Sequence, residues 1–225
     1  LSAIKCLRAL GIKIIFKNNT CLIVGRGING FKFRKNITLN AGNSGTVGRL
    51  ILPLLIRSPY KIRIIGDKSL SKRDFSRVIN PLNEIGAKFY PKNRGRLPIS
   101  IIGSDYLRPI SYYEKRGSAQ CKTCVMLASL NTPGEMRIFA KKSRNHTELM
   151  FKELKIPIKI KNKKNFNIIK TSRPTKLSKF NLNIPGDISS ASFFIALTLL
   201  SKKSQLRLKN INLNPSRLGI LKILN

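Results

Sequence analysis

Residues 39–49 combine the side chains and the spacing that an anion-binding pocket needs. This segment holds three glycines, two small hydroxyl side chains and Arg49, and it lies between a strand-like stretch and an apolar helical stretch. Glycine lets the backbone come close to a ligand, and the first N–H groups of a helix are unpaired and partly positive. The segment therefore predicts a site for phosphate or carboxylate, with an ordinary glycine-rich turn as the alternative.

Gly25–Gly30 has the glycine spacing of a dinucleotide-binding loop and follows a strand-like run. The next residues, Phe31–Arg34, alternate as a strand does, whereas the dinucleotide motif continues as a helix. No acidic residue stands about 20 positions further on, where the contact to the ribose belongs. We interpret Gly25–Gly30 as a hairpin turn. Since no P-loop lysine follows the glycines of residues 39–49 either, we expect no cofactor.

Cys121 and Cys124 have the spacing of a metal or redox pair. The chain has four cysteines and one histidine, and no second closely spaced cysteine pair completes a zinc site. Both cysteines lie in an apolar helical run, where a free thiol behaves as a small hydrophobic side chain. We therefore expect no metal and no redox role.

The charge of the chain makes a neutral or cationic partner improbable. Forty-four Lys and Arg residues face nine Asp and Glu residues, which gives a net charge of +35 and favours an anionic partner. RNA is one candidate. However, the basic residues are spread along the whole chain, Trp is absent, and no nucleic-acid module is recognisable. No specific nucleic acid is therefore expected.

The remaining composition indicates a soluble, cytoplasmic protein. The longest apolar run, 47–56, is interrupted by Gly48, Arg49 and Pro53, so no membrane span is expected. No signal peptide is visible, and the few cysteines fit a reducing compartment. The chain starts with Leu1 inside a helical pattern and stops shortly after an apolar run, so we expect it to be a piece of a longer protein.

Three segments share one pattern, in which the end of a helix is followed by a short break and an alternating strand. They are Leu7–Phe16, Leu82–Tyr90 and Phe151–Ile160. Their wide spacing predicts a domain made of a few similar α/β units. Between the units, Arg108–Arg116 and Lys161–Lys164 read as surface loops. The Pro185–Gly186 break precedes a new helix and predicts a boundary between domains 1–185 and 186–225.

Six blocks, taken in order, resemble the 5-enolpyruvylshikimate-3-phosphate synthase family, and three of them resemble its class II branch. The blocks are Asn43–Arg49, Gly66–Arg73, Gly117–Lys122, Ser143–Glu148, Pro185–Ala191 and Asn212–Arg217. The resemblance covers essentially the whole chain but only about the middle half of the family's length. It implies a two-domain, inside-out α/β barrel of repeated sheet-and-helix units, with one domain nearly complete here and the other only begun.

The resemblance implies transfer of the enolpyruvyl group of phosphoenolpyruvate to the 5-hydroxyl of shikimate 3-phosphate, with release of phosphate, in the shikimate pathway to chorismate and aromatic amino acids. Both substrates are anions, which helix N-termini and guanidinium groups bind well. The implied contacts to phosphoenolpyruvate are Gly45, Arg73 and Gln120. The implied contacts to shikimate 3-phosphate are Ser118, Ala119, Gln120 and Arg144.

The resemblance places no catalytic acid or base within this chain. His146 and Asp187 are more typical of structural or capping positions than of proton transfer, and the family's proton-transfer motifs would lie outside residues 1–225. We expect the 225 residues alone to have no transferase activity, and the complete protein to be a monomer. The alternatives are a UDP-N-acetylglucosamine enolpyruvyl transferase, which shares the fold, and a basic RNA-binding protein.

Overall fold

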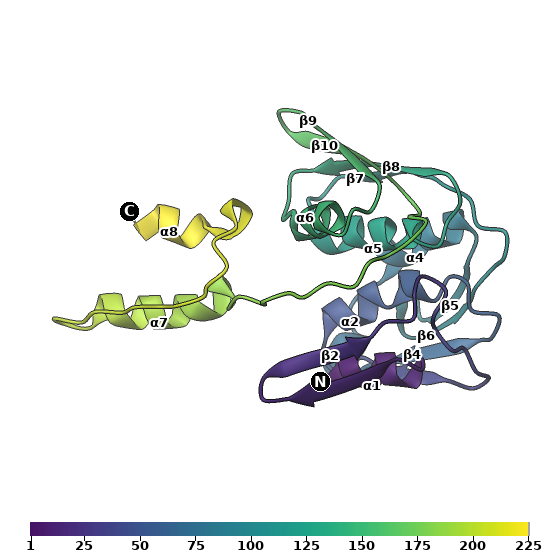
Figure 1. Ribbon diagram of the computed structural model, residues 1–225, viewed down its shortest axis with the longest axis horizontal. Helices are drawn as coiled ribbons and strands as arrows, with labels where there is room; N and C mark the ends of the chain where they lie inside the picture. Colours follow the sequence, from purple (N-terminus) through teal and green to yellow (C-terminus); the bar gives the residue numbers. More distant parts are fainter. Residues whose placement is uncertain (225) are drawn as a thin grey trace. The chain divides into compact units, whose positions relative to one another are not determined.

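The computed structural model describes residues 1–224 and divides into two compact units (Figure 1). Unit 1 comprises Leu1–Lys142 and His146–Lys179, and unit 2 comprises Ser143–Asn145 and the residues from Phe180 onward. The change from one unit to the other at 179–180 comes shortly before the Pro185–Gly186 break. The division into domains 1–185 and 186–225 stays a prediction.

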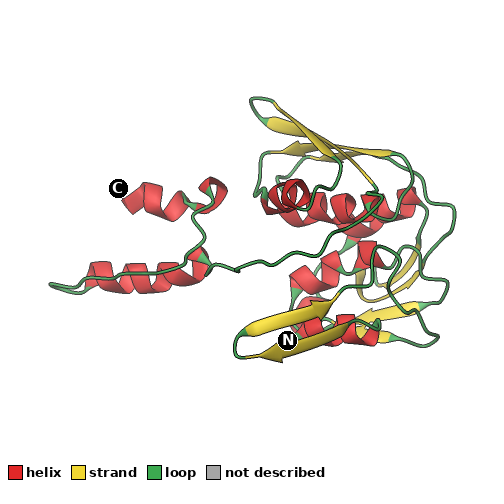
Figure 2. Cartoon of the chain, viewed as in Figure 1, coloured by secondary structure: helices red, strands yellow, loops and turns green. Residues whose placement is uncertain are grey.

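Unit 1 mixes helices and strands along its length (Figure 2). Its strands are β1 (Lys13–Lys17), β2 (Thr20–Val24), β3 (Thr38–Asn40), β4 (Ile62–Ile65), β5 (Lys88–Lys92), β6 (Arg96–Ile102), β7 (Ser111–Glu114), β8 (Glu135–Lys141), β9 (Ile158–Asn162) and β10 (Phe166–Ser172). Its helices are α1 (Ser2–Ala9), α2 (Gly45–Leu50), η1 (Leu52–Leu54), α3 (Lys68–Ser71), α4 (Ser76–Ile85), α5 (Ala119–Ser129) and α6 (His146–Glu153).

Two four-stranded sheets in unit 1 have the same topology. Their orders are β3-β4-β6-β5 and β7-β8-β10-β9. In each sheet the first two strands are parallel, and the other two pairs are antiparallel. A helix connects the two parallel strands, as a parallel crossover requires. This duplication confirms the prediction of repeated α/β units.

The three repeated segments all end a helix in the same way. α1, α4 and α6 are each followed by a residue with positive φ and then by β1, β5 or β9. The residue is Gly11 or Gly86 in two cases and Lys155 in the third. At Gly86 a Cβ atom would lie 2.6 Å from the carbonyl oxygen of Tyr106, so this turn requires glycine both for its φ of 125° and for space.

Helices α2, α4 and α5 lie between the two sheets in Figure 1. α5 contacts α2, α4 and β8, and it buries residues on nearly every side, including Cys121 and Cys124. Apolar residues all round a helix are typical of a fully buried one. The arrangement, with sheets outside and helices within, is the mixed α/β architecture that the resemblance implied.

Two local predictions were wrong. Gly25–Gly30 is no hairpin turn, because β2 pairs with β1 around Asn18–Asn19, and Phe31–Arg34 is not a strand. Both asparagines have positive φ, which a tight hairpin turn needs and asparagine tolerates. Arg108–Arg116 is not only a loop, because it contains β7, and Lys161 belongs to β9.

Unit 2 contains α7 (Ile188–Leu200), η2 (Pro215–Arg217) and α8 (Gly219–Leu224). Asp187 caps α7 by accepting a hydrogen bond of 3.2 Å from the Ser189 N–H, as its sequence position predicted. That bond, together with the charge of Arg217, holds the pKa of Asp187 below its ordinary value. The large apolar side chains of α7, such as Phe193, are mostly exposed.

None of the helices in residues 1–224 combines the length and the apolar character needed to cross a membrane. In the same range, no three His, Cys, Asp or Glu side chains come together in a way that could hold a metal ion.

Candidate anion-binding site

The predicted anion pocket lies where β3 ends and α2 begins. Asn40 accepts a hydrogen bond of 2.8 Å from the N–H of Gly42, which has a φ of 58°. Asn43 donates to Asp67 at 2.6 Å, so the start of α2 is tied to the loop that precedes α3. Ser44 caps α2 by accepting a hydrogen bond of 3.2 Å from the N–H of Val47.

Two guanidinium groups meet at Gly45. A Cβ atom on this residue would lie 3.0 Å from Nη1 of Arg49 and 3.1 Å from Nη1 of Arg73. Arg49 comes from the next turn of α2, and Arg73 follows α3. Two like charges so close together repel each other, and an anion between them would remove that repulsion. The absence of a side chain at Gly45 leaves room for such an anion.

Arg49 is fixed in place, whereas Arg73 is free. Arg49 donates to the Gln120 side chain at 3.1 Å and to the Asp74 carbonyl at 3.4 Å, and it lies 5.1 Å from the centre of the Phe75 ring. Arg73 is exposed, and its guanidinium has no hydrogen-bond or ion-pair partner within residues 1–224. A free guanidinium beside a fixed one is well suited to binding a phosphate through two hydrogen bonds.

Gln120 joins the two α/β repeats at this point. Its Oε1 accepts the hydrogen bond from Arg49, and its Nε2 donates to Thr46 at 3.0 Å. Gln120 lies in the first turn of α5, directly after Ser118 and Ala119. The first turns of α2 and α5 therefore lie next to each other, and both direct their unpaired N–H groups and partial positive charge to this region.

A buried carboxylate holds the start of α5. Glu114, at the end of β7, is 3% exposed and accepts a hydrogen bond of 2.8 Å from the Ser118 N–H. Its other oxygen accepts from the Arg116 N–H at 3.3 Å and from Arg77 at 2.5 Å. The side chain of Ser118 caps α5 by accepting from the N–H of Cys121. Arg77 neutralises a carboxylate that would otherwise repel an anion at the start of α5.

A second buried ion pair joins α5 to α6. Nζ of Lys122 lies 2.5 Å from Oε1 of Glu148, and the two side chains are 1% and 3% exposed. Next to them, the hydroxyl groups of Thr123 and Thr147 share a hydrogen bond of 2.6 Å. These two contacts fix α6 against the helix that carries Ser118, Ala119 and Gln120.

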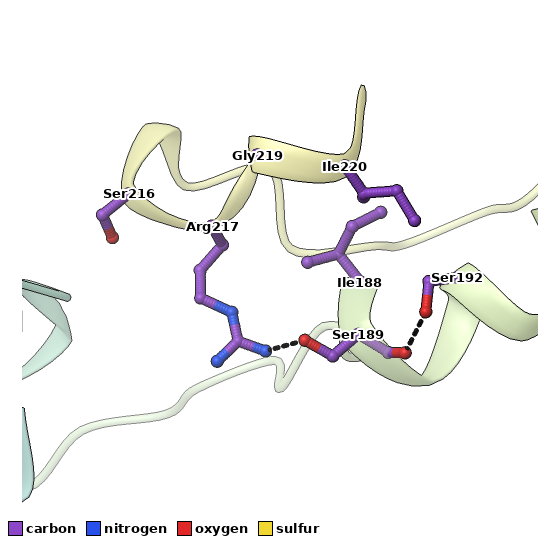
Figure 3. A pocket seen from close by; sticks show the side chains of 7 residues that line it. All are labelled: Ile188, Ser189, Ser192, Ser216, Arg217, Gly219 and Ile220. Atoms are coloured by element: carbon purple, nitrogen blue, oxygen red, sulfur yellow. Dashed lines mark hydrogen bonds between the residues drawn. The ribbon is translucent and has the colours of Figure 1, made fainter. Parts of the chain in front are cut away.

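Unit 2 contains Arg144 and a separate small pocket. Arg144 is exposed and is grouped with Ser143 and Asn145 in this unit. The pocket, of about 360 Å³, lies between the start of α7 and the η2–α8 segment (Figure 3). Arg217 points to the start of α7 there, where it donates to Ser189 at 2.6 Å and pairs with Asp187. Because its charge is already paired, Arg217 acts as a structural tie within unit 2.

The structure brings together the predicted residues of unit 1: Gly45 and Arg73 at one helix start, and Ser118, Ala119 and Gln120 at the other. Arg144 belongs to unit 2, which is described separately. Sequence reasoning assigned no role to Arg77 or Glu114, and it gave Thr46 and Arg49 no separate contact. The signal for Arg49 was present, because residues four apart lie on the same face of a helix. No sequence signal pointed to Glu114, because it lies in a stretch that reads as a loop.

Comparison with known proteins gives a consistent result. A family model for EPSP synthase (3-phosphoshikimate 1-carboxyvinyltransferase) matches residues 1–225. Curated proteins with the name 3-phosphoshikimate 1-carboxyvinyltransferase are 38% identical over 226 residues in Enterococcus faecalis and 40% identical in Ruthia magnifica, and both alignments cover 100% of this chain. The chain spans about half the length of these relatives, 52% and 50%.

A solved structure of EPSP synthase from Acinetobacter baumannii matches the fold with a TM-score of 0.85 at 32% identity. The match covers 99% of this chain and 50% of that one. The sheet-and-helix repeats thus match the fold of enolpyruvyl transferases. The chain belongs to the EPSP synthase (3-phosphoshikimate 1-carboxyvinyltransferase) family.

Proposed function

We propose that the protein to which these residues belong transfers the enolpyruvyl group of phosphoenolpyruvate to the 5-hydroxyl of shikimate 3-phosphate and releases phosphate. The observation that carries this proposal is the meeting of the Arg49 and Arg73 guanidinium groups at Gly45. Phosphoenolpyruvate carries a phosphate and a carboxylate, and two cations at an open helix start suit such a compact polyanion.

We propose separate roles for the two helix starts. Arg73 would hold the phosphate of phosphoenolpyruvate, with Gly45 leaving room for it and Arg49 orienting Gln120. Ser118, Ala119 and Gln120, at the start of α5, would bind shikimate 3-phosphate, and Arg144 is proposed as a contact to the same substrate on the family resemblance alone. In this assignment Gln120 contacts both substrates, which agrees with its hydrogen bonds to Arg49 and Thr46.

No residue of this chain is assigned to proton transfer. The arrangement at α2 and α5 offers cations, amides and hydroxyl groups, which bind and orient anions and stabilise developing negative charge. Transfer to the 5-hydroxyl also needs a general acid and a general base. The proposed division of labour therefore makes this chain the substrate-binding half, without transferase activity of its own.

Titration of the ¹⁵N-labelled 225-residue chain with shikimate 3-phosphate, followed by NMR, tests the proposal. We expect saturable shifts of the Ser118, Ala119 and Gln120 amides, and further shifts at Gly45 and Thr46 when phosphoenolpyruvate is added. UDP-N-acetylglucosamine serves as the competing ligand. Shifts of the same amides with that nucleotide sugar, and none with shikimate 3-phosphate, would replace the proposal with the related transferase.

We further propose a cytoplasmic location and a monomeric complete protein. All four cysteines are free, and three of them are buried. This state suits a compartment that keeps thiols reduced. Size-exclusion chromatography with light scattering measures the molar mass of the complete protein, and a mass equal to one chain would support a monomer.

A further inference from the structure

The outer face of the β7-β8-β10-β9 sheet is open. Along β8, Met136, Ile138 and Ala140 are buried, while the residues between them point to the other face. Helices α5 and α6 cover the buried face in Figure 1, and no other element of unit 1 covers the outer face there. The outward side chains are Tyr113, Glu135, Arg137, Phe139, Lys141, Lys159, Lys161, Phe166, Ile168 and Lys170.

Aromatic rings form one part of this outer face. The rings of Tyr113 and Phe139 are stacked, with their centres 4.7 Å apart and an angle of 7° between their planes. Tyr113 is 59% exposed and belongs to β7, the edge strand of the sheet. Phe139 stacks on one face of the Tyr113 ring, and more than half of Tyr113 stays exposed. The stack can therefore be extended at the sheet edge by another flat ring.

Cations form the other part. Arg137, Lys170 and Lys159 are register partners on three neighbouring strands, so three positive charges stand in one row. Glu135 pairs with Arg137 at 3.1 Å and with Lys170 at 3.4 Å. Lys159 and Lys161 have no ion-pair partner within residues 1–224. Like charges directly opposite each other destabilise a sheet, and a bound polyanion would reverse this effect.

We propose that this outer face binds single-stranded nucleic acid, with bases stacked on Tyr113 and Phe166 and phosphates at Arg137, Lys159 and Lys161. Exposed aromatic rings among lysines on an open sheet are the chemistry that single strands require, because their bases have free faces and their backbone is anionic. A duplex hides its base faces and cannot use the rings. The net charge of +35 adds long-range attraction for any polyanion.

This face differs from the substrate pocket in position and in ligand. The proposed substrate site lies at the starts of α2 and α5, whereas the proposed surface uses side chains of the strands on the side away from α5. The sequence argued against nucleic acid because the basic residues are spread along the chain, Trp is absent and no nucleic-acid module is recognisable. The strands bring together Tyr113, Phe139 and Phe166, which lie far apart along the chain.

Fluorescence anisotropy of a labelled 20-nucleotide single-stranded RNA, with single-stranded DNA in parallel, tests the proposal on the 225-residue chain. Tyr113→Ala and Phe166→Ala should each lower the affinity by about fivefold or more, since each removes a stacked base. Tyr113→Phe keeps the ring and should keep the affinity. These three changes leave the net charge as it is.

The two lysines of β9 are tested against a control pair that removes the same number of charges. Lys159→Gln with Lys161→Gln should lower the affinity and reduce the slope of log K against log salt by about 1.4. Lys13→Gln with Lys17→Gln, on exposed positions of β1, removes the same charge and should change both quantities much less. Equal losses from the two pairs, or an unchanged affinity in Tyr113→Ala and Phe166→Ala, would overturn the proposal. Stronger binding to duplex RNA or to phosphatidylserine vesicles than to either single strand would also overturn it.

Discussion

Arg49 and Gln120 are 71 positions apart in the sequence, and their side chains are joined by a hydrogen bond of 3.1 Å between Nη1 and Oε1. Arg49 belongs to α2 of one sheet-and-helix repeat, and Gln120 belongs to α5 of the next. This bond places the proposed anion site at the contact between the two repeats. A change in either helix is therefore expected to be felt at both proposed substrate positions.

Replacement of Arg49 by Met should release Gln120 and lower the affinity for both phosphoenolpyruvate and shikimate 3-phosphate. The lost hydrogen bonds should lower the free energy of unfolding by only about 1 kcal/mol. Arg49→Lys is the matched control, because it keeps the charge without the planar donor pair. Isothermal titration of both ligands separates charge from geometry, and equal affinities in Arg49→Met and the native chain would contradict the bridging role.

Gly45→Ala should weaken ligand binding and leave the fold unchanged. The added methyl group would push the Arg49 and Arg73 guanidinium groups apart by a few tenths of an ångström and occupy the proposed phosphate position. We expect roughly tenfold weaker binding of phosphoenolpyruvate, about 1.4 kcal/mol, at unchanged thermal stability. Gly25→Ala meets no atom within 4 Å and serves as the control. Full affinity in Gly45→Ala would show that the ligand lies elsewhere.

The pair of Arg77 and Glu114 predicts a rescue. Arg77→Met leaves the Glu114 carboxylate buried and uncompensated beside the start of α5, which should lower the stability by about 1–3 kcal/mol, limited by the 37% exposure of the arginine. It should also weaken the binding of shikimate 3-phosphate more than that of shikimate. Adding Glu114→Gln removes the unpaired charge and should restore the binding of the phosphate ester. No recovery in the double variant would rule out the electrostatic cause.

Lys122 and Glu148 form an ion pair within the core of unit 1. Lys122→Met should cost about 3–5 kcal/mol, because the Glu148 carboxylate is left in a buried site. The double variant Lys122→Met with Glu148→Leu should recover most of that loss. Lys152→Met, at an exposed position of the same helix α6, should stay within about 0.5 kcal/mol. Chemical unfolding measures all three, and a double variant as unstable as the single one would contradict the buried pair.

Cysteine reactivity tests the burial of α5 without any ligand. Burial raises the pKa of the Cys6 and Cys124 thiols, so at pH 8 they remain protonated and shielded. Iodoacetamide should therefore modify only the exposed Cys21 in the folded chain and all four cysteines in denaturant. Mass spectrometry counts the adducts, and Cys21→Ser should abolish the reaction of the folded chain. Fast alkylation of Cys124 would mean that α5 is not packed as described.

The sequence was informative where local pattern and tertiary contact agree. The repeated helix-to-strand segments predicted the duplicated sheets, and the residues of 39–49 predicted the strand-to-helix turn that carries Gly45 and Arg49, while its role as an anion site stays a prediction. It was uninformative where a contact depends on distant parts of the chain. Glu114 stands among basic and aromatic residues and gives no sign of burial, yet its neighbours in space, Arg77 and the Ser118 N–H, make burial favourable.

The most direct test is calorimetric titration of phosphoenolpyruvate into the 225-residue chain in the presence of excess shikimate 3-phosphate. Arg73→Met is compared with Arg94→Met, which removes an exposed arginine from the turn between β5 and β6 and so matches the change in charge. We predict saturable binding that Arg73→Met abolishes and Arg94→Met leaves within twofold. Equal binding by the two variants would contradict a substrate site at Gly45 and Arg73.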